Sequence, residues 1–310
     1  MLVGFDVVGF GALNVDRVFR VSGIVGREGE GFVLGSWESC GGSAANTVVG
    51  LARLGLKAGF VGKVGSDREG RLLVEDFKKE GVDTGGVVVA ENGQSGVVMG
   101  FVDEEGERAL YVAPGVNDTI DIKEVNTKYM ENTSFLHMTS FVGETSFKSQ
   151  KKLVEQLPAH VKVSFDPGML YAKRGLNALR TIVKRAFVML PNEIELKMLT
   201  RKGYEAGAEE LISEGVKVVG VKLGKKGCFV TNGKESHMVE PFKVKVMDTT
   251  GAGDAWNAGF LYGLIKQRSL SECGTLGNFV ASRCITSKGA RNGLPQHSDL
   301  KQLSIGSENP

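Results

Sequence analysis

The sequence predicts a doubly wound α/β fold, in which helices cover both faces of a mostly parallel sheet. Apolar, β-branched segments alternate with amphipathic segments of helical period, first at 2–9, 43–54, 59–64 and 71–79. The strand segments are apolar throughout, which is typical of strands that are buried on both faces. Glycine supplies 43 of the 310 residues, about twice its usual share, and indicates many tight loops between these elements.

The alternation continues through the second half of the chain. Strands are predicted at 135–138, 161–165, 187–190 and 216–222, and helices at 147–156 and 255–266. Neither an internal repeat nor a linker divides the sequence. We therefore expect one domain over residues 1–310.

Two stretches interrupt the alternation. Residues 17–39 contain short strand-like pieces with glycine turns, and residues 93–114 contain two apolar runs around an acidic turn, as in a β-hairpin. We expect them to form a small antiparallel sheet, which would act as a lid over the crevice at the carboxyl ends of the parallel strands. An edge hairpin without a functional role is the alternative.

Charge and composition exclude several classes of function. The formal net charge is +2, from 38 basic and 36 acidic residues, so nucleic acid is not expected as a partner. The four cysteines form no CxxC pair, which favours free thiols in a reducing cytoplasm over a disulfide framework or a zinc site. The sequence shows neither a basic signal-peptide region nor an apolar run of the ~20 residues that cross a membrane.

The strongest motif is the run Asp248-Thr-Thr-Gly-Ala-Gly-Asp254 before a predicted helix. The small residues Gly251, Ala252 and Gly253 leave successive backbone amides bare at a helix N-terminus, which is an anion site by geometry and by dipole. An acidic side chain beside it is a poor choice for simple phosphate binding. Asp254 is better explained as the acceptor of a hydroxyl proton, while the amides stabilise a phosphoryl group in transfer.

Two further patterns lie nearer the N-terminus. Gly41 and Gly42 open a helix that carries Asn46 in its first turn, where glycine lets the backbone approach a ligand. Asn14 and Asp16 alternate with apolar residues at the predicted end of the first strand, so their side chains point the same way and suit paired hydroxyl groups. A capped turn is the plainer interpretation. The nearby Gly-Phe-Gly lacks the third glycine of a dinucleotide site.

The second half of the chain carries two more candidates. Asn192 and Glu195 have the spacing of a helix capping box, and they also suit a hydrated Mg²⁺, which takes few protein ligands. Lys222, Gly224 and Gly227 follow another predicted strand, in a loop that suits a nucleotide.

The runs Gly41–Asn46 and Asp248–Asp254 resemble the two signatures of the ribokinase-like carbohydrate kinases, the PfkB family. The resemblance covers nearly the whole chain in the same order and spacing. It implies a doubly wound α/β core with a β lid, and ATP-dependent phosphorylation of a hydroxymethyl group. ATP and Mg²⁺ would be required, K⁺ would occupy a separate site, and we expect a homodimer formed through the lid.

The resemblance also implies roles for individual residues. Asp254 matches the catalytic base and 251–253 the anion hole. Sugar-contacting positions are matched by Asn14, Asp16, Gly41, Gly42, Asn46 and Glu144. The magnesium and phosphate motif is matched by Asn192 and Glu195, the nucleotide loop by Lys222, Gly224 and Gly227, and a position beside the adenine by Asn278. The monovalent-cation site is matched by Asp248, Thr250, Cys284, Ser287 and Gly289.

One departure bears on the substrate. Ribokinases typically carry lysine where this sequence has Ser43. Nucleoside kinases of the family often show the Gly-Gly-Ser/Ala form, and Phe165-Asp-Pro-Gly168 also resembles those relatives. The acceptor is therefore either a small sugar, as in ribokinases and fructokinases, or a nucleoside such as adenosine, cytidine or inosine, with the sugar slightly favoured.

Overall fold

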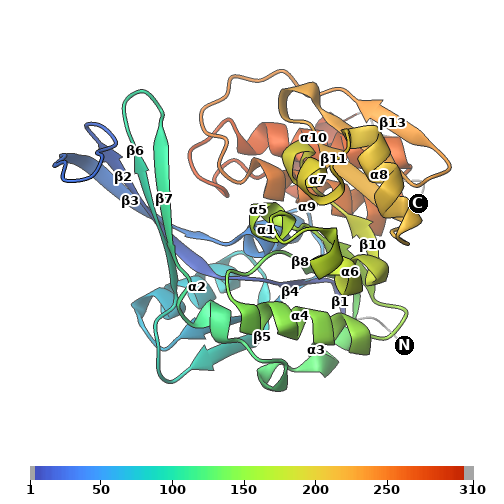
Figure 1. Ribbon diagram of the computed structural model, residues 1–310, viewed down its shortest axis with the longest axis horizontal. Coiled ribbons are helices and arrows are strands. Elements are labelled where there is room, and N and C mark those ends of the chain that lie inside the picture. Colours follow the sequence, from blue (N-terminus) through green and yellow to red (C-terminus); the bar gives the residue numbers. More distant parts are fainter. Residues whose placement is uncertain (1–3, 304–310) are drawn as a thin grey trace.

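The computed structural model describes residues 4–303, which form a nine-stranded sheet and a separate four-stranded sheet (Figure 1). In spatial order the large sheet contains β13 (Ser236–Val239), β12 (Cys228–Thr231), β11 (Val218–Lys222), β10 (Ala186–Met189), β9 (Lys162–Phe165), β8 (Thr133–Met138), β1 (Phe5–Phe10), β4 (Ala58–Gly65) and β5 (Asp83–Ala90). All neighbouring pairs from β11 to β5 are parallel, whereas β12 is antiparallel to both β11 and β13. The predicted fold class is confirmed.

Helices cover both faces of this sheet, and each face has its own apolar core. Successive residues of β1 supply both cores, Val7 on one side and Val8 on the other, as the two-residue period of a strand requires. The first face carries α1 (Ser43–Arg53), α2 (Arg68–Lys79), α9 (Ala252–Ile265) and α10 (Leu270–Cys284). The second carries α3 (Thr127–Glu131), α4 (Glu144–Gln156), α5 (Gly168–Ala172), α6 (Leu176–Arg185), α7 (Glu193–Thr200) and α8 (Tyr204–Ser213). Short 3₁₀ helices lie at Gly115–Thr119, Ile122–Glu124, Gly224–Lys226 and His297–Gln302.

The smaller sheet projects from the body of the molecule (Figure 1). Its order is β3 (Val33–Gly41), β2 (Asn14–Val21), β6 (Gly96–Val102) and β7 (Arg108–Ala113). The two interrupting stretches therefore form one sheet, as expected. The expectation of a wholly antiparallel sheet is wrong, because β2 and β6 pair in parallel. The reason is that β2 and β6 come from separate excursions of the chain, between which β4, α2 and β5 are formed in the large sheet.

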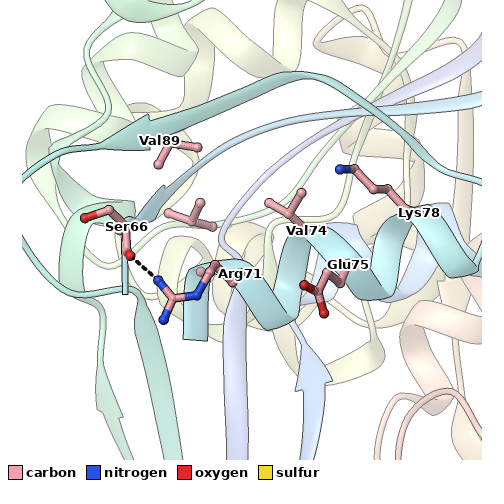
Figure 2. A pocket seen from close by; sticks show the side chains of 9 residues that line it. Ser66, Arg71, Val74, Glu75, Lys78 and Val89 are labelled. Carbon is pink, nitrogen blue, oxygen red and sulfur yellow. Dashed lines mark hydrogen bonds between the residues drawn. The ribbon is translucent and has the colours of Figure 1, made fainter. Parts of the chain in front are cut away.

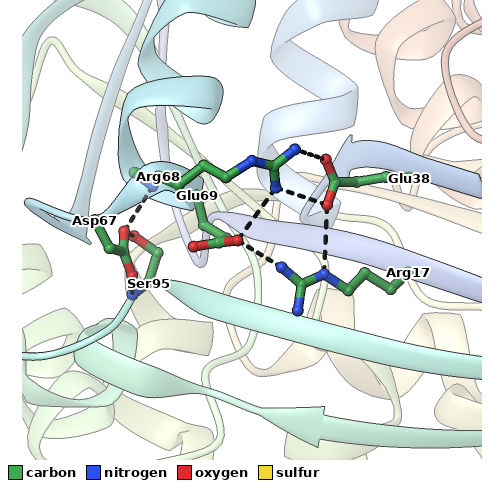
Figure 3. Close-up of polar contacts among 7 residues, drawn as sticks. Arg17, Glu38, Asp67, Arg68, Glu69 and Ser95 are labelled. Atoms are coloured by element: carbon green, nitrogen blue, oxygen red, sulfur yellow. Dashed lines mark hydrogen bonds and ion pairs between the residues drawn. The ribbon is translucent and has the colours of Figure 1, made fainter.

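The base of the smaller sheet is joined to α2 by a network of ion pairs (Figure 3). Glu38 of β3 pairs with Arg17 of β2 at 3.3 Å and with Arg68 of α2 at 2.7 Å. Glu69 of α2 in turn pairs with Arg17. The alternating charges connect two strands of the smaller sheet to one helix of the large one.

Candidate active site

The carboxyl ends of four neighbouring parallel strands bring polar residues to one edge of the sheet. Asp166 follows β9, Asn192 follows β10, Lys222 ends β11, and Glu144 lies beyond β8 as the first residue of α4. In sheets of this topology ligands bind in the crevice outside these strand ends. A cavity of about 730 Å³ lies there, and its walls include Asp166, Asn192, Lys222 and Asp254.

The first turn of α9 forms the anion site predicted from the glycine-rich motif. The helix begins at Ala252, three residues earlier than predicted, so Asp254 lies within its first turn. Gly251 has a positive φ of 75°, and a β-carbon there would lie 2.5 Å from that of Ala290. This position therefore requires glycine. Gly253 has an ordinary φ, and a β-carbon there would lie in ordinary van der Waals contact, 3.7 Å from Lys222 Nζ.

Of the three amides predicted to be bare, those of Gly251 and Gly253 make no hydrogen bond within residues 4–303, whereas that of Ala252 does. The Ala252 amide donates to the Thr249 carbonyl at 3.2 Å, and the Ala255 amide to the Gly251 carbonyl at 2.8 Å. Within residues 4–303, the amides of Gly253 and Asp254 bind no other group. The prediction that Ala252 contributes a bare amide is wrong, because the turn before the helix already uses it. The free amides of Gly253 and Asp254 lie at the positive end of the helix dipole.

The Asp254 carboxyl group is partly buried and receives two hydrogen bonds from α1. The Ser43 hydroxyl donates to Oδ1, and the Asn46 side-chain amide donates to Oδ2 at 2.9 Å. Burial raises the pKa of Asp254 to about 6, against the two hydrogen bonds, which lower it. At neutral pH the group is therefore an ionised carboxylate that can still accept a proton.

Arg291 holds Asn46 in the orientation that this contact needs. Its Nε donates to Asn46 Oδ1 at 2.8 Å, and its Nη1 pairs with Asp76 of α2. Because the guanidinium occupies the carbonyl side of the Asn46 amide, the NH₂ side is directed at Asp254. Sequence reasoning missed Ser43 as a partner of Asp254, and it missed Arg291 altogether.

The two predicted hydroxyl-binding residues, Asn14 and Asp16, lie at the start of β2 in the smaller sheet. The prediction that they end the first strand is wrong, because β1 stops at Phe10. Burial raises the pKa of Asp16 to about 6, and the charge of Arg291 opposes this rise. A β-carbon on Gly41 would lie 2.2 Å from Asp16 Oδ2, so glycine at position 41 leaves room for the carboxylate.

Asn14 is linked to the start of α4 through the 3₁₀ helix Gly115–Thr119. Asn117 donates to Asn14 Oδ1 at 3.0 Å, and its own carbonyl accepts from Ser146 at 2.8 Å. Glu144 begins the same helix α4, and its side chain forms an ion pair with Arg174. Neither Glu144 nor Arg174 lines the large cavity.

Asn192 and Glu195 form the capping box that their spacing predicted, at the start of α7. Asn192 Oδ1 accepts from the Glu195 amide, and Glu195 Oε2 accepts from the Asn192 amide, both at 2.9 Å. Both residues also line the large cavity. Burial, and then the charge of Asp166, raise the pKa of Glu195 to about 7. Asn192 and Glu195 therefore cap α7, and the Glu195 carboxyl group still faces the cavity.

The predicted nucleotide-loop residues Gly224 and Gly227 also line this cavity, together with Lys222. Asn278 lines it too, but its amide is fully engaged by the chain. Its Nδ2 donates to the carbonyls of Val239 and Glu240, and its Oδ1 accepts from Trp256. Asn278 therefore fixes the indole and the backbone that form the cavity wall.

All five residues predicted to hold a monovalent cation are connected by direct contacts. Asp248 accepts from Thr250 and, through Oδ2, from the Gly289 amide at 2.8 Å. The Cys284 thiol lies 3.7 Å from the Thr250 carbonyl. Ser287 is one turn away, and its amide donates to the Cys284 carbonyl at 3.3 Å. The loop that follows α10 is thereby tied to the segment that precedes the anion site.

Other features of the described residues add no second site. Figure 2 shows a cavity of about 220 Å³ beside α2 and β5, where Arg71 donates to the Ser66 carbonyl. None of the predicted site residues lines it. All four cysteines are free thiols. Within residues 4–303, no cluster of three His, Cys, Asp or Glu side chains could hold a metal ion, and no helix is long and apolar enough to span a membrane.

Comparison with known proteins gives consistent matches along the chain. A model of the pfkB family of carbohydrate kinases matches residues 5–297. An uncharacterized sugar kinase of Archaeoglobus fulgidus is 50% identical over 81% of this chain and 100% of its own length. An ATP-dependent ribose-1-phosphate kinase of Halopiger xanaduensis is 33% identical over 92% of this chain and 94% of that protein. The crystal structure of Thermotoga maritima ribokinase has a TM-score of 0.87 at 25% identity, covering 97% of this chain and 100% of that one.

Proposed function

Because this chain belongs to the PfkB family of carbohydrate kinases, we propose that it transfers the γ-phosphoryl group of ATP to the hydroxymethyl group of a small sugar. The observation that carries the proposal is the pairing at the start of α9. A partly buried carboxylate, Asp254, lies beside two backbone amides that have no other partner within residues 4–303, at the edge of a cavity large enough for a nucleotide.

In the proposed reaction the acceptor hydroxyl group binds next to Asp254. The proton of this hydroxyl group passes to the Asp254 carboxylate as the hydroxyl oxygen forms a bond to the γ-phosphorus atom. The bond between that phosphorus and the β,γ-bridging oxygen breaks, and its electron pair stays with ADP. The free amides of Gly253 and Asp254 and the dipole of α9 stabilise the charge on the equatorial oxygens of the group in transfer.

ATP would occupy the large cavity, with its phosphates directed at the N-terminus of α9. Asn192 and Glu195 supply an amide and a carboxyl group to the same cavity, a donor set that fits a Mg²⁺ ion keeping most of its waters. The ion would neutralise charge on the β- and γ-phosphates when bound. A K⁺ ion would lie in the loops of Asp248 and Cys284, where it would stiffen the segment before the anion site.

The acceptor would lie between Asp254 and the smaller sheet, which we propose acts as a lid over it. Asp16, Asn14 and Asn46 would bind its hydroxyl groups, with Gly41 and Gly42 allowing its close approach. Glu144 and Arg174 lie beyond Asn14, where they would contact the substituent at the far carbon. The name of the Halopiger relative makes a sugar 1-phosphate a specific candidate, since the Arg174 guanidinium would attract its phosphate.

The smaller sheet also supports the proposed homodimer. Its strands β3 and β7 expose large apolar side chains, including Val33, Trp37, Leu110 and Tyr111. The strand register places Trp37 and Leu110 on one face of the sheet and Val33 and Tyr111 on the other, and exposed apolar side chains of this kind favour an interaction surface. The four free thiols support a reducing, cytoplasmic environment.

The acceptor is identified by measuring ADP release with ribose, fructose, ribose 1-phosphate, adenosine, cytidine and inosine. We expect a sugar or sugar phosphate to have the highest kcat/KM. A nucleoside with kcat/KM ~10²-fold above every sugar, which is ~3 kcal/mol of transition-state binding, would contradict the sugar proposal and favour a nucleoside kinase. Equal ADP release with and without every acceptor would contradict both.

A further inference from the structure

Lys222 places a buried ammonium group beside the anion site of α9. Its Nζ atom forms an ion pair with Asp166 Oδ2 at 2.6 Å and donates to Asn257 Oδ1 at 3.2 Å. Lys222 ends β11 and Asp166 follows β9, two strands that β10 separates in the large sheet, while Asn257 lies one turn after Gly253 in α9. The lysine therefore bridges the strand ends and the helix that carries Asp254.

The distance to the anion site is short. A β-carbon built on Gly253 would lie 3.7 Å from Lys222 Nζ, with the end of this side chain as its nearest neighbour. The space directly in front of Gly253 is thus bordered by the free amides on one side and by the ammonium on the other. Both groups line the same cavity.

The ammonium retains donor capacity toward this space. A lysine ammonium has three N–H donors and no acceptor. Within residues 4–303, Asp166 and Asn257 are its hydrogen-bond partners, so one donor is left for a ligand. Asp166 is itself held by Asn257 Nδ2 at 2.6 Å and by the Gly168 amide at 3.0 Å. The counterion is therefore fixed, and the lysine has little freedom to turn away.

The surrounding charges favour the cationic form of the lysine. The carboxyl groups of Asp166, Glu195 and Asp254 all act on Lys222, and together they raise its pKa against the effect of burial. A buried ion pair of this kind is weak evidence for a purely stabilising role, because desolvation offsets much of its attraction. A fixed positive charge beside an anion site is what phosphoryl transfer needs.

We propose that Lys222 is a further catalytic residue, which donates a hydrogen bond to the phosphoryl group during its transfer. This inference rests on the proposed kinase function. As the acceptor oxygen bonds to phosphorus and the bond to the bridging oxygen of ADP breaks, Lys222 and the Gly253 amide hold the transferring group from two sides. Asp166 is a positioning residue, because it acts through the lysine.

The test compares Lys222→Met with wild type, using whichever acceptor the wild-type enzyme phosphorylates fastest. Lys226→Met is the matched control, since Lys226 belongs to the same loop and its exposed side chain, among the residues that the structure describes, pairs only with Glu193, at 3.7 Å. We expect Lys222→Met to lower kcat by ~10²–10³, the usual effect of removing a preorganised donor. The control should retain wild-type kcat.

A second measurement separates catalysis from structure. For Lys222→Met we expect the affinity for ADP with fluoroaluminate, in the presence of acceptor, to fall by about the same factor as kcat, while the Kd for a non-hydrolysable ATP analogue changes less than threefold. Asp166→Asn retains the ammonium but loosens it, and should lower kcat by a smaller factor. If Lys222→Met does not fold, Lys222→Arg retains the charge and tests the same two affinities.

Three outcomes would contradict the inference. These are an unchanged kcat in folded Lys222→Met, an equal loss of affinity for the ATP analogue and for the fluoroaluminate complex, and an effect of Lys226→Met as large as that of Lys222→Met. The proposed function fails separately, if the wild-type protein phosphorylates no acceptor at all.

Discussion

Replacing Ser43 with alanine removes one of the two hydrogen bonds that the Asp254 carboxylate accepts, and leaves the bond from Asn46 in place. The pKa of Asp254, about 6, is set by burial against these donors. A hydrogen bond to a charged group contributes about 1.5–3 kcal/mol, and one pKa unit corresponds to about 1.4 kcal/mol. Loss of the Ser43 donor disfavours the ionised form, so the pKa should rise by about 1–2 units.

The direction of the pH effect follows from the proposed role of Asp254 as a proton acceptor. Only the ionised carboxylate can act as the base, so kcat/KM should fall as the pH decreases through the pKa. The acid limb of the Ser43→Ala profile should therefore move from about pH 6 to about pH 7–8. At pH 6 the variant should be slower than wild type by on the order of tenfold, and above pH 9 nearly equal to it.

The assay is kcat/KM from pH 4.5 to 9.5 for wild type, Ser43→Ala and the control Ser236→Ala. Ser236 is exposed on the edge strand β13, so its profile should match wild type. An acid limb of Ser43→Ala that stays at the wild-type pH would refute the reasoning. Asp254 would then not be the group whose ionisation limits the rate, or Ser43 would not bind it during turnover.

Three further predictions concern the surroundings of the base. Gly253→Val should abolish turnover without lowering Tm, because its φ is ordinary and its side chain would fill the phosphoryl space; a folded and fully active variant would contradict this. Activity should rise when K⁺ replaces Na⁺ or tetramethylammonium, through the loop of Asp248; identical rates in the three salts would count against that site. Arg291→Met should lower the free energy of unfolding in urea by about 3 kcal/mol, because the carboxylate of Asp76 loses its buried partner. The variant should also lower kcat, because the amide of Asn46 becomes free to turn. An unchanged free energy of unfolding together with an unchanged kcat would be inconsistent with the orienting role.

Local sequence patterns predicted the parts of the site that depend on backbone conformation. The glycine-rich run before α9 and the apolar strands have a direct signature in residue type, so the anion site, Asp254 and the fold class could be predicted. The same holds for the capping box of Asn192 and Glu195. These features depend on residues within one or two helical turns of each other.

The contacts that tune the base could not be predicted in this way. Ser43 and Asp254 are 211 residues apart, and Arg291 and Asn46 are 245 apart. Both contacts arise because α1 packs against α9 and the loop after α10. The parallel pairing of β2 with β6 was missed for a similar reason, because strand direction is set by the path of the chain between them. Lys222 was predicted only as part of a nucleotide loop, since its position against Gly253 is a tertiary contact.

The most direct test of the account is the turnover of Asp254→Asn. Asparagine preserves the shape of the side chain; its oxygen can accept from Asn46 and its NH₂ group can donate to the Ser43 hydroxyl, but it cannot accept the hydroxyl proton. The account predicts that kcat falls by ~10²–10⁴, the usual contribution of a general base, while the Kd for ATP changes little and the protein remains folded. Turnover close to wild type in this variant, with its acceptor bound normally, would contradict the assignment of Asp254 as the base.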